Sequence, residues 1–144
     1  MIAVQYPKAD FRVKNEAGRR FIFDKIRKTW LLLTEEEWVR QNFVNYLQSV
    51  LNYPAAFIAL EKEIRLNELK KRFDILVYDK AHHPWMLVEC KEPKVQLQEE
   101  VLHQVLRYNI SVPVQYIVIT NGEHTIAWQK EGGALMILDV LPVW

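Results

Sequence analysis

The sequence predicts an α/β domain in which one mixed β-sheet is flanked by helices, and three observations support this class. Apolar residues recur at helical spacing in residues 35–51 and 95–109. Between and after these segments lie short runs rich in β-branched and aromatic residues, at 56–66, 72–78, 85–91 and 115–120. The length of 144 residues corresponds to a single domain, 1–144, with enough chain to bury a core.

The composition excludes several classes of protein. Apolar residues make up 50% of the chain and charged residues 26%, which is typical of a folded globular domain. The single cysteine, Cys90, excludes an internal disulfide framework and a cysteine-rich zinc site, so we expect a reducing, cytoplasmic location. With only four glycines, the chain has no glycine-rich loop for a nucleotide. We expect neither a signal peptide nor a membrane span.

Charge is distributed unevenly along the chain, although its net value is only +1. Residues 1–33 carry eight basic and three acidic groups, a net charge of +5, and the remaining residues carry 11 basic and 15 acidic groups. We expect residues 1–20 to form a basic N-terminal arm on a slightly acidic body, which suits a polyanionic partner. On this feature alone, an unevenly charged solvated surface is the simpler interpretation.

The first helix is predicted from its cap and from its apolar spacing. A short strand over Phe21-Ile22-Phe23 precedes it. Thr34 is an N-cap candidate with Glu37 at the third helical position, as in a capping box. The acidic residues after Thr34 also complement the dipole of a helix N-terminus. The helix is expected to run from about Glu35 to Leu51 and to end before Pro54.

Three strands, a second helix and further strands are predicted to follow. Turns are expected at 79–84 and at Gly132-Gly133, and Pro93 separates the third strand from the helix at 95–109. Asn121-Gly122 is a strong hairpin signal, so the strands on either side of it should pair with each other. The strands are expected at 56–66, 72–78, 85–91, 115–120, 124–129 and 134–138.

Charged residues within two apolar strands are the candidates for chemistry. Side chains alternate between the faces of a strand, so Glu89 and Lys91 share one face. Fifteen positions separate Asp74 from Glu89, enough for a hairpin that sets their two carboxylates side by side. Asp74 is expected on the face opposite to three apolar residues of its strand, Phe73, Ile75 and Val77.

Such a carboxylate pair has a chemical use. Two adjacent buried carboxylates repel each other and resist ionisation, and a divalent cation such as Mg²⁺ relieves both effects. A nearby lysine adds positive charge where a phosphoryl transition state gains negative charge, and it can orient an attacking water. Two carboxylates, a lysine and a metal ion are sufficient for phosphodiester hydrolysis. On spacing alone, solvated charges at strand ends explain Asp74, Glu89 and Lys91 more simply.

Several motifs together resemble a known family. Arg72-Phe73-Asp74 followed by Val88-Glu89-Cys90-Lys91 resembles the motif of the PD-(D/E)XK nuclease superfamily, with Phe73 in place of the proline that names it. The segment from Glu36 to Gln41 resembles the first-helix motif of the N-terminal nuclease domain of type I restriction enzyme R subunits. Gln104-x3-Tyr108 is similar to the Gln-x3-Tyr motif of the RecB-like branch, and Thr120-Asn121-Gly122 to the strand-end motif after it. The resemblance spans residues 21–138.

The resemblance implies a restriction-endonuclease-like fold with an α-β-β-β-α-β core. It implies that Mg²⁺, for which Mn²⁺ can substitute, is bound by Asp74, Glu89 and the backbone carbonyl of Cys90. Lys91 would be the catalytic lysine, and Gln104 would support the site. A first-helix glutamate often joins this site in the superfamily. Here that residue is Glu37 or Glu36, and Glu37 is preferred because Gln41 lies one turn further along the same face. Helix capping explains both glutamates equally well.

The expected activity is that of a metal-dependent DNA endonuclease of the restriction or DNA-processing type. Lys70, Lys71, Arg72 and Tyr108 are candidate nucleic-acid contacts, although a solvated turn and a core aromatic residue explain them as well. Gln104 is either a site residue or a satisfied core amide. The alternative function is a non-catalytic nucleic-acid-binding or assembly module on the same fold. A homodimer or partner subunits are possible for either, and classical ATP-driven restriction is not expected of this chain alone.

Overall fold

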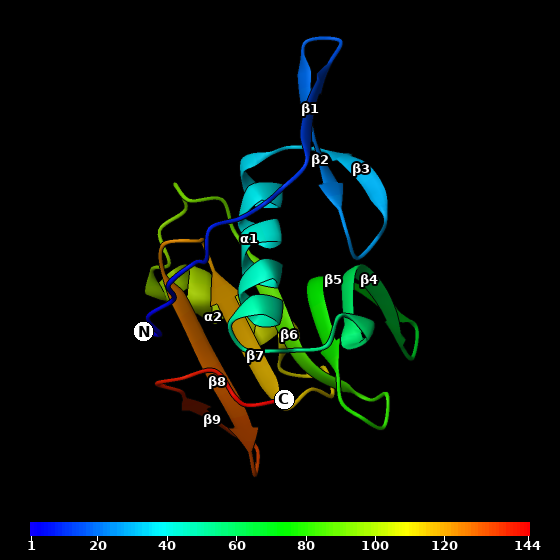
Figure 1. Ribbon diagram of the computed structural model, residues 1–144. Coiled ribbons are helices and arrows are strands. Elements are labelled where there is room, and N and C mark those ends of the chain that lie inside the picture. Colours follow the sequence, from blue (N-terminus) through cyan, green and yellow to red (C-terminus); the bar gives the residue numbers. More distant parts are fainter.

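The structure is a computed structural model that describes residues 1–144, apart from the side chains of Leu66 and Leu69. It contains two β-sheets, two α-helices and a short 3-10 helix (Figure 1). The helices are α1 (Glu35–Ser49), η1 (Ala55–Phe57) and α2 (Glu99–Asn109). The first sheet contains β1 (Val13–Glu16), β2 (Arg19–Asp24) and β3 (Thr29–Leu32). The second contains β4 (Ile58–Leu66), β5 (Leu69–Tyr78), β6 (Pro84–Cys90), β7 (Tyr116–Thr120), β8 (Thr125–Glu131) and β9 (Ala134–Ile137).

The large sheet is mixed and has the strand order β4-β5-β6-β7-β8-β9. All neighbouring pairs are antiparallel except β6 and β7, which are parallel and are joined through α2. A parallel pair needs such a crossover, because a tight turn can only reverse the chain direction. The order α1-β4-β5-β6-α2-β7 confirms the predicted α/β class and the α-β-β-β-α-β core.

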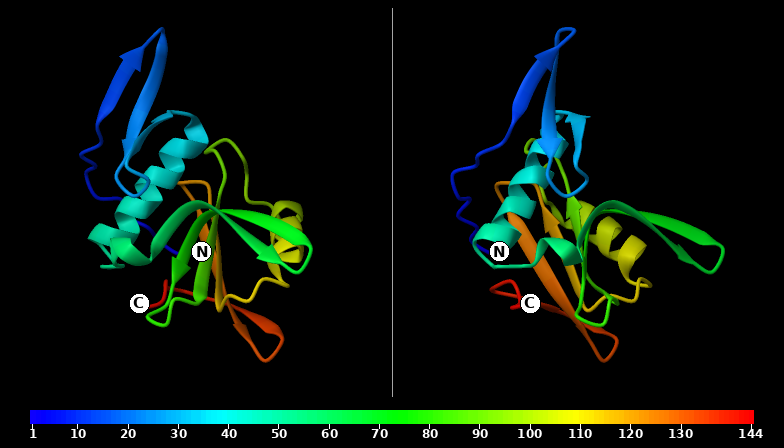
Figure 2. Two further views of the ribbon diagram at one scale, coloured as in Figure 1. Left: turned by 90° about the vertical axis from the view of Figure 1, so that its right-hand side faces the viewer. Right: turned by 45° about the vertical axis from the view of Figure 1, so that its right-hand side comes forward.

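The two helices cover opposite faces of the large sheet (Figure 2). On one face, α1 contributes Val39, Phe43 and Leu47 to a core shared with β5 and β6. On the other face, Val105 of α2 packs in a second core with Leu76 and other residues of the sheet. Neither described helix is long and apolar enough to cross a membrane.

The boundaries of both helices follow from local hydrogen bonds. The hydroxyl of Thr34 accepts from the backbone N–H of Glu37 at 3.0 Å, which confirms the predicted N-cap. Helix α1 ends at Ser49, two residues before the expected end. Helix α2 begins at Glu99, four residues after the expected start, because Val95 is held in a turn. The backbone N–H of Val95 donates to the carbonyl of Glu92, and the carbonyl of Val95 accepts from the side chain of Asn121.

The N-terminal region is more regular than the sequence indicates. The expected arm contains all of β1 and the start of β2, and the expected strand at residues 21–23 extends to a six-residue strand. The hairpin turn between β1 and β2 is Ala17-Gly18, where both residues have positive φ values, 52° and 76°. Such backbone angles are typical of tight hairpins, but Ala-Gly is a weaker signal than Asn-Gly. The hairpin projects beyond the N-terminal end of α1 (Figure 1).

The regular alternation of side chains breaks at Asp74. The prediction that Phe73, Ile75 and Val77 share one face is wrong for Phe73, which packs in the α2-side core while the other two pack in the α1-side core. The β4–β5 register contains no pair between Glu61 and Asp74, and Glu61 has a φ of 52°. A positive φ of this size strains the backbone of a non-glycine residue. The break in the ladder turns Asp74 toward α1.

Candidate active site

Asp74 and Glu89 meet where the pairing of β5 with β6 ends. The last regular pair at this end is Ile75 with Val88, so Asp74 and Glu89 are the next residues on the two strands. The carboxylate of Asp74 accepts a hydrogen bond from the backbone N–H of Cys90 at 2.7 Å. The hairpin expected from the fifteen-residue spacing therefore forms, and it brings the two carboxylates to one end of the sheet.

Glu89 is an incompletely compensated charge. Its ion-pair partner is the ammonium of Lys91, with 3.9 Å between Nζ and Oε1, and both side chains are partly buried. Burial and the charge of Asp74 together raise the pKa of Glu89 to about 7, and the charge of Lys91 only partly opposes them. At neutral pH the Glu89 carboxyl group is therefore near its titration midpoint, and additional positive charge would favour its ionised form.

A cavity joins Glu89 and Lys91 to helix α2. It has a volume of about 250 Å³, and Gln104 and Tyr108 line its helical side. Gln104 is exposed and Tyr108 is 53% exposed, so neither is a core residue. The structure therefore brings both residues of the Gln-x3-Tyr motif to the same cavity as the Glu-x-Lys pair. The other lining residues are Val101, Val105 and Asn109.

The two candidate glutamates of α1 have different surroundings. Glu37 is only 6% exposed, and its carboxylate accepts from Arg40 at 2.6 Å and from Arg27 and Gln41 at 3.1 Å. Glu36 is exposed at the helix N-terminus. Partial burial raises the pKa of Glu36, and the charge of Asp74 raises it further. Glu36 therefore shares the electrostatic environment of Asp74, whereas Glu37 is engaged by arginines.

The sequence favours Glu37, because Gln41 lies on the same helical face, and the amide of Gln41 does donate to the Glu37 carboxylate. That face turns inward toward Arg27 rather than toward the carboxylate pair. The signal that could have favoured Glu36 is Arg40. Arg40 lies three positions after Glu37, so the two can form an ion pair within the helix, and they do so at 2.6 Å. Such a pair occupies Glu37 and leaves Glu36 as the other candidate.

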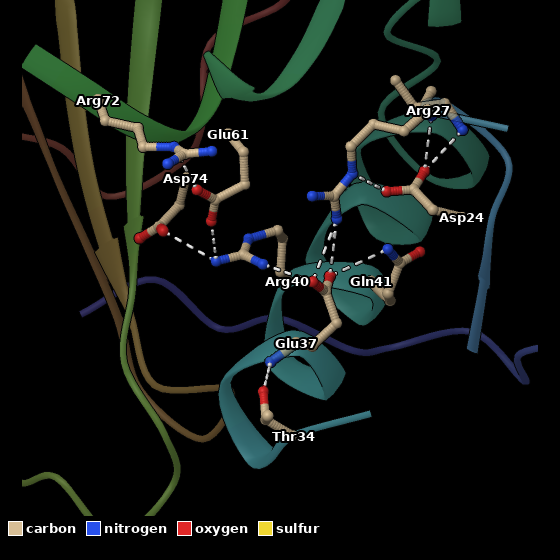
Figure 3. Close-up of polar contacts among 10 residues, drawn as sticks. Asp24, Arg27, Thr34, Glu37, Arg40, Gln41, Glu61, Arg72 and Asp74 are labelled. Atoms are coloured by element: carbon tan, nitrogen blue, oxygen red, sulfur yellow. Dashed lines mark hydrogen bonds and ion pairs between the residues drawn. The ribbon is translucent and has the colours of Figure 1, made fainter. Parts of the chain in front are cut away.

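Arg40 connects α1 to the carboxylate end of the sheet (Figure 3). One nitrogen, Nη2, lies 2.9 Å from Asp74 Oδ1 and 2.6 Å from Glu61 Oε1. The other, Nη1, lies 2.6 Å from Glu37 Oε1. Burial alone would lower the pKa of Arg40, but the carboxylates of Glu37 and Asp74 raise it above its ordinary value. The guanidinium is thus a permanently charged group that holds three carboxylates together.

The ion pairs continue from Arg40 in both directions (Figure 3). Toward the N-terminal sheet, Glu37 binds Arg27, and Arg27 in turn binds the fully buried Asp24 at the end of β2. Toward the surface, Glu61 binds Arg72 at 2.8 Å. Acidic and basic groups alternate along the whole series, so each buried charge is flanked by opposite charges, which offsets its desolvation.

The basic segment before Asp74 is divided between the interior and the surface. Lys71 is buried, and its ammonium donates to the carbonyl of Tyr108 at the C-terminal end of α2 and lies 3.3 Å from Ser111 Oγ. These contacts make Lys71 a cap for the helix carbonyls rather than a surface cation. Lys70 and Arg72 are exposed, and Arg72 contacts Glu61.

The oxygen donors at the site suit a hard divalent cation. The N–H of Lys91 donates to Thr120 of β7 at 2.8 Å, and in a trans peptide the preceding carbonyl of Cys90 then points the opposite way, toward β5 and Asp74. Among the described residues, no group of three or more His, Cys, Asp or Glu side chains is arranged to hold a metal ion. Two carboxylates and one carbonyl fit Mg²⁺, which usually completes its shell with water and phosphate oxygens.

Replacement of Arg40 by methionine is expected to destabilise the fold by about 3–5 kcal/mol at pH 7, because Glu37, Glu61 and Asp74 lose their shared cation. Acid should partly restore the variant, since protonation removes the repulsion among these carboxylates. Urea unfolding at pH 7 and pH 5 measures both effects. The exposed Arg107→Met on α2 serves as the control and should unfold like the original chain. An Arg40→Met variant as stable as that control would contradict this account.

The stability of the metal-free chain should depend on pH through Glu89. Its pKa is raised from 4.5 to about 7 on folding, so the folded state retains a proton that the unfolded chain releases. Stability should therefore fall by up to about 3 kcal/mol as the pH rises from 4.5 to 7, and remain level above that.

Thermal unfolding of the original chain and of Glu89→Gln, in the presence of a chelator, tests this dependence. The Gln variant should lose this part of the pH profile, whereas the exposed Glu100→Gln on α2 should retain it. A Glu89→Gln profile that superimposes on that of the original chain would refute the assignment.

The chain matches the model of one protein family. The family model described as type I restriction enzyme R protein N terminus matches residues 35–142, from the first residue of α1 to beyond β9. No curated protein matched the chain. The match includes both strands that carry Asp74 and Glu89, whereas the N-terminal sheet precedes it. The chain therefore belongs to the family of type I restriction enzyme R protein N-terminal domains.

Proposed function

We propose that the protein is a metal-dependent nuclease that hydrolyses phosphodiester bonds in DNA. The observation that carries this proposal is the arrangement at the end of β5 and β6. There Asp74 and Glu89 adjoin, Lys91 lies beside Glu89, and Gln104 lines the same cavity as Glu89 and Lys91. Membership of a restriction enzyme family supports DNA as the substrate.

Asp74, Glu89 and the carbonyl of Cys90 are the proposed ligands of Mg²⁺ or Mn²⁺. Glu36 is favoured over Glu37 as the additional carboxylate, because partial burial and the charge of Asp74 raise the pKa of Glu36 while Glu37 is engaged by two arginines. When bound, the ion would lower the pKa of a coordinated water and neutralise charge on the scissile phosphate.

The remaining roles belong to side chains of the cavity. The ammonium of Lys91, fixed near Glu89, would stabilise the negative charge that develops on the phosphoryl oxygens. The exposed amide of Gln104 can donate to a phosphate oxygen or accept from a water, so it would orient either one. Lys70 and Arg72 are proposed backbone contacts, because both are exposed on the strand that carries Asp74.

Replacement of Lys91 by alanine should abolish cleavage of a DNA duplex in Mg²⁺ or Mn²⁺ while the thermal unfolding midpoint stays close to that of the original chain. Lys94→Ala is the matched control, since Lys94 is an exposed lysine three positions later and should be dispensable. Gel-based cleavage of linear and supercoiled DNA gives the rates. Cleavage by Lys91→Ala at the rate of the control would exclude the proposed mechanism.

Metal binding can be measured without knowing the substrate. Titration calorimetry with Mn²⁺ should show binding to the original chain and none to the double variant Asp74→Ala, Glu89→Ala. A second titration is made with a DNA duplex present, because phosphate oxygens of the DNA can complete the metal site. Equal heats from both proteins under both conditions would contradict the carboxylate pair as a metal site.

A second candidate function is a nucleic-acid-binding module without catalysis. The contact between Arg40 and Asp74 favours it, because a guanidinium already compensates one of the two carboxylates. This function predicts salt-sensitive DNA binding that is unaffected by Mn²⁺ and by Asp74→Ala. The Mn²⁺ titration therefore separates the two candidates.

A further inference from the structure

The N-terminal sheet has an inward and an outward face. Ile22 in β2 is fully buried, so its neighbours Phe21 and Phe23 belong to the opposite, outward face. Lys14 of β1 pairs with Phe21, and Trp30 of β3 pairs with Phe23. We define the outward face by six residues on this side of the sheet, namely Arg12, Lys14, Arg19, Phe21, Phe23 and Trp30.

Cations on the outward face lie over aromatic rings. The guanidinium carbon of Arg12 is 4.9 Å from the ring centroid of Phe23 and 5.3 Å from that of Trp30. The ammonium of Lys14 is 4.5 Å from the Trp30 centroid, and the guanidinium of Arg19 is 5.9 Å from that of Phe21. Cation–π contacts restrict these long side chains, so less conformational entropy is lost when they bind an anion.

The two arginines of this face are available to a partner. Both are exposed, and among the described residues neither forms an ion pair. Lys14 differs, because its ammonium lies 3.2 Å from Glu16. The face therefore offers two uncompensated guanidinium groups, which bind phosphate with parallel hydrogen bonds.

The sheet is fixed relative to the candidate active site. Asp24 at the end of β2 binds Arg27, and Arg27 binds Glu37 in the first turn of α1. Glu36 lies in the same helical turn, and the charge of Asp74 acts on it. The β1–β2 hairpin extends from this end of α1 (Figures 1 and 2), so a ligand on the outward face would lie on the side of the molecule where α1 begins.

The carboxylates at the candidate active site repel DNA, so binding of DNA there requires a positively charged surface elsewhere on the molecule. Asp74, Glu89, Glu61 and Glu36 make that region rich in carboxylates, which repel the phosphates of a DNA substrate. Residues 1–33 hold a net charge of +5, while the rest of the chain holds 11 basic and 15 acidic groups. The positive charge needed for affinity to a polyanion is therefore concentrated in residues 1–33, which contain the N-terminal sheet and precede the family match.

We propose that the outward face of the N-terminal sheet binds the sugar–phosphate backbone of the DNA duplex that the site cleaves, with Arg12 and Arg19 as its phosphate ligands. This inference rests on the proposed nuclease function, which it extends by naming the surface that holds the substrate. The aromatic rings hold the cations in place, and the backbone phosphates supply the regularly spaced negative charge.

The test is a binding measurement in the absence of metal. A fluorescein-labelled duplex and its separate single strand are titrated in a chelator, with anisotropy followed from about 50 to 200 mM salt. The test variant is Arg12→Gln with Arg19→Gln. The control, Lys80→Gln with Arg107→Gln, removes the same net charge from exposed positions in the β5–β6 turn and on α2. Thermal unfolding verifies that both variants are folded.

Loss of two phosphate contacts should weaken duplex binding by about 60-fold at 0.1 M salt and reduce the slope of log K against log salt by about 1.8. The control should bind like the original chain. Duplex affinity and slope equal to those of the control would overturn the proposal, as would a loss confined to the single strand, which indicates base stacking instead. Absence of duplex binding by the original chain would also overturn it.

These outcomes are distinguishable from failure of the nuclease itself. The binding experiment uses no metal, whereas the comparison of Lys91→Ala with Lys94→Ala measures cleavage directly. A chain that cleaves DNA normally after the loss of Arg12 and Arg19 retains the proposed function and loses only the proposed surface.

Discussion

The buried guanidinium of Arg40 is the interaction on which the rest of the structure depends. It binds Glu37 on its own helix, Glu61 on β4 and Asp74 on β5, so one side chain ties α1 to two strands of the large sheet. Its planar fork can serve several carboxylates at once, which a lysine ammonium with a single charged atom does less well. Without this cation, Glu37 and Glu61 would keep only their more distant partners Arg27 and Arg72. Asp74 would lose the ion pair that holds it toward α1 across the break in the β4–β5 ladder.

This arrangement divides the carboxylates into compensated and uncompensated members. Arg40 compensates Glu37, Glu61 and part of Asp74, whereas the one ion pair of Glu89 among the described residues is with Lys91, at 3.9 Å. The raised pKa of Glu89 is the electrostatic consequence, and it occurs beside a cavity that solvent can enter. Carboxylates with shifted pKa values in cavities are characteristic of functional sites, because a bound ligand can supply the positive charge that the protein does not provide. The proposed nuclease function gives this local imbalance a reason, namely the binding of a metal ion and a phosphate.

The same network unites two regions that the chain keeps chemically separate. The large sheet collects carboxylates at one end, and the small N-terminal sheet collects exposed cations and aromatic rings. The series Asp24–Arg27–Glu37–Arg40–Asp74 connects them through buried ion pairs. A cation surface and a carboxylate cluster placed side by side would neutralise each other, so their separation preserves both local charges, and the ion pairs fix their relative position.

Much of this molecule follows from local sequence signals. Thr34 caps α1, apolar periodicity marks both helices, and the spacing of Asp74 and Glu89 on adjacent apolar strands predicts that they meet. Each of these depends on residues close in sequence, where backbone geometry and capping act directly. Tertiary structure alone decided that arginines engage Glu37 and leave Glu36 exposed, that Lys71 caps α2 and that Phe73 packs on the α2 side. The reason is the range of the interactions: Arg40 reaches Asp74 across 34 positions and Lys71 reaches Tyr108 across 37, and no local pattern specifies which distant partner satisfies a buried charge.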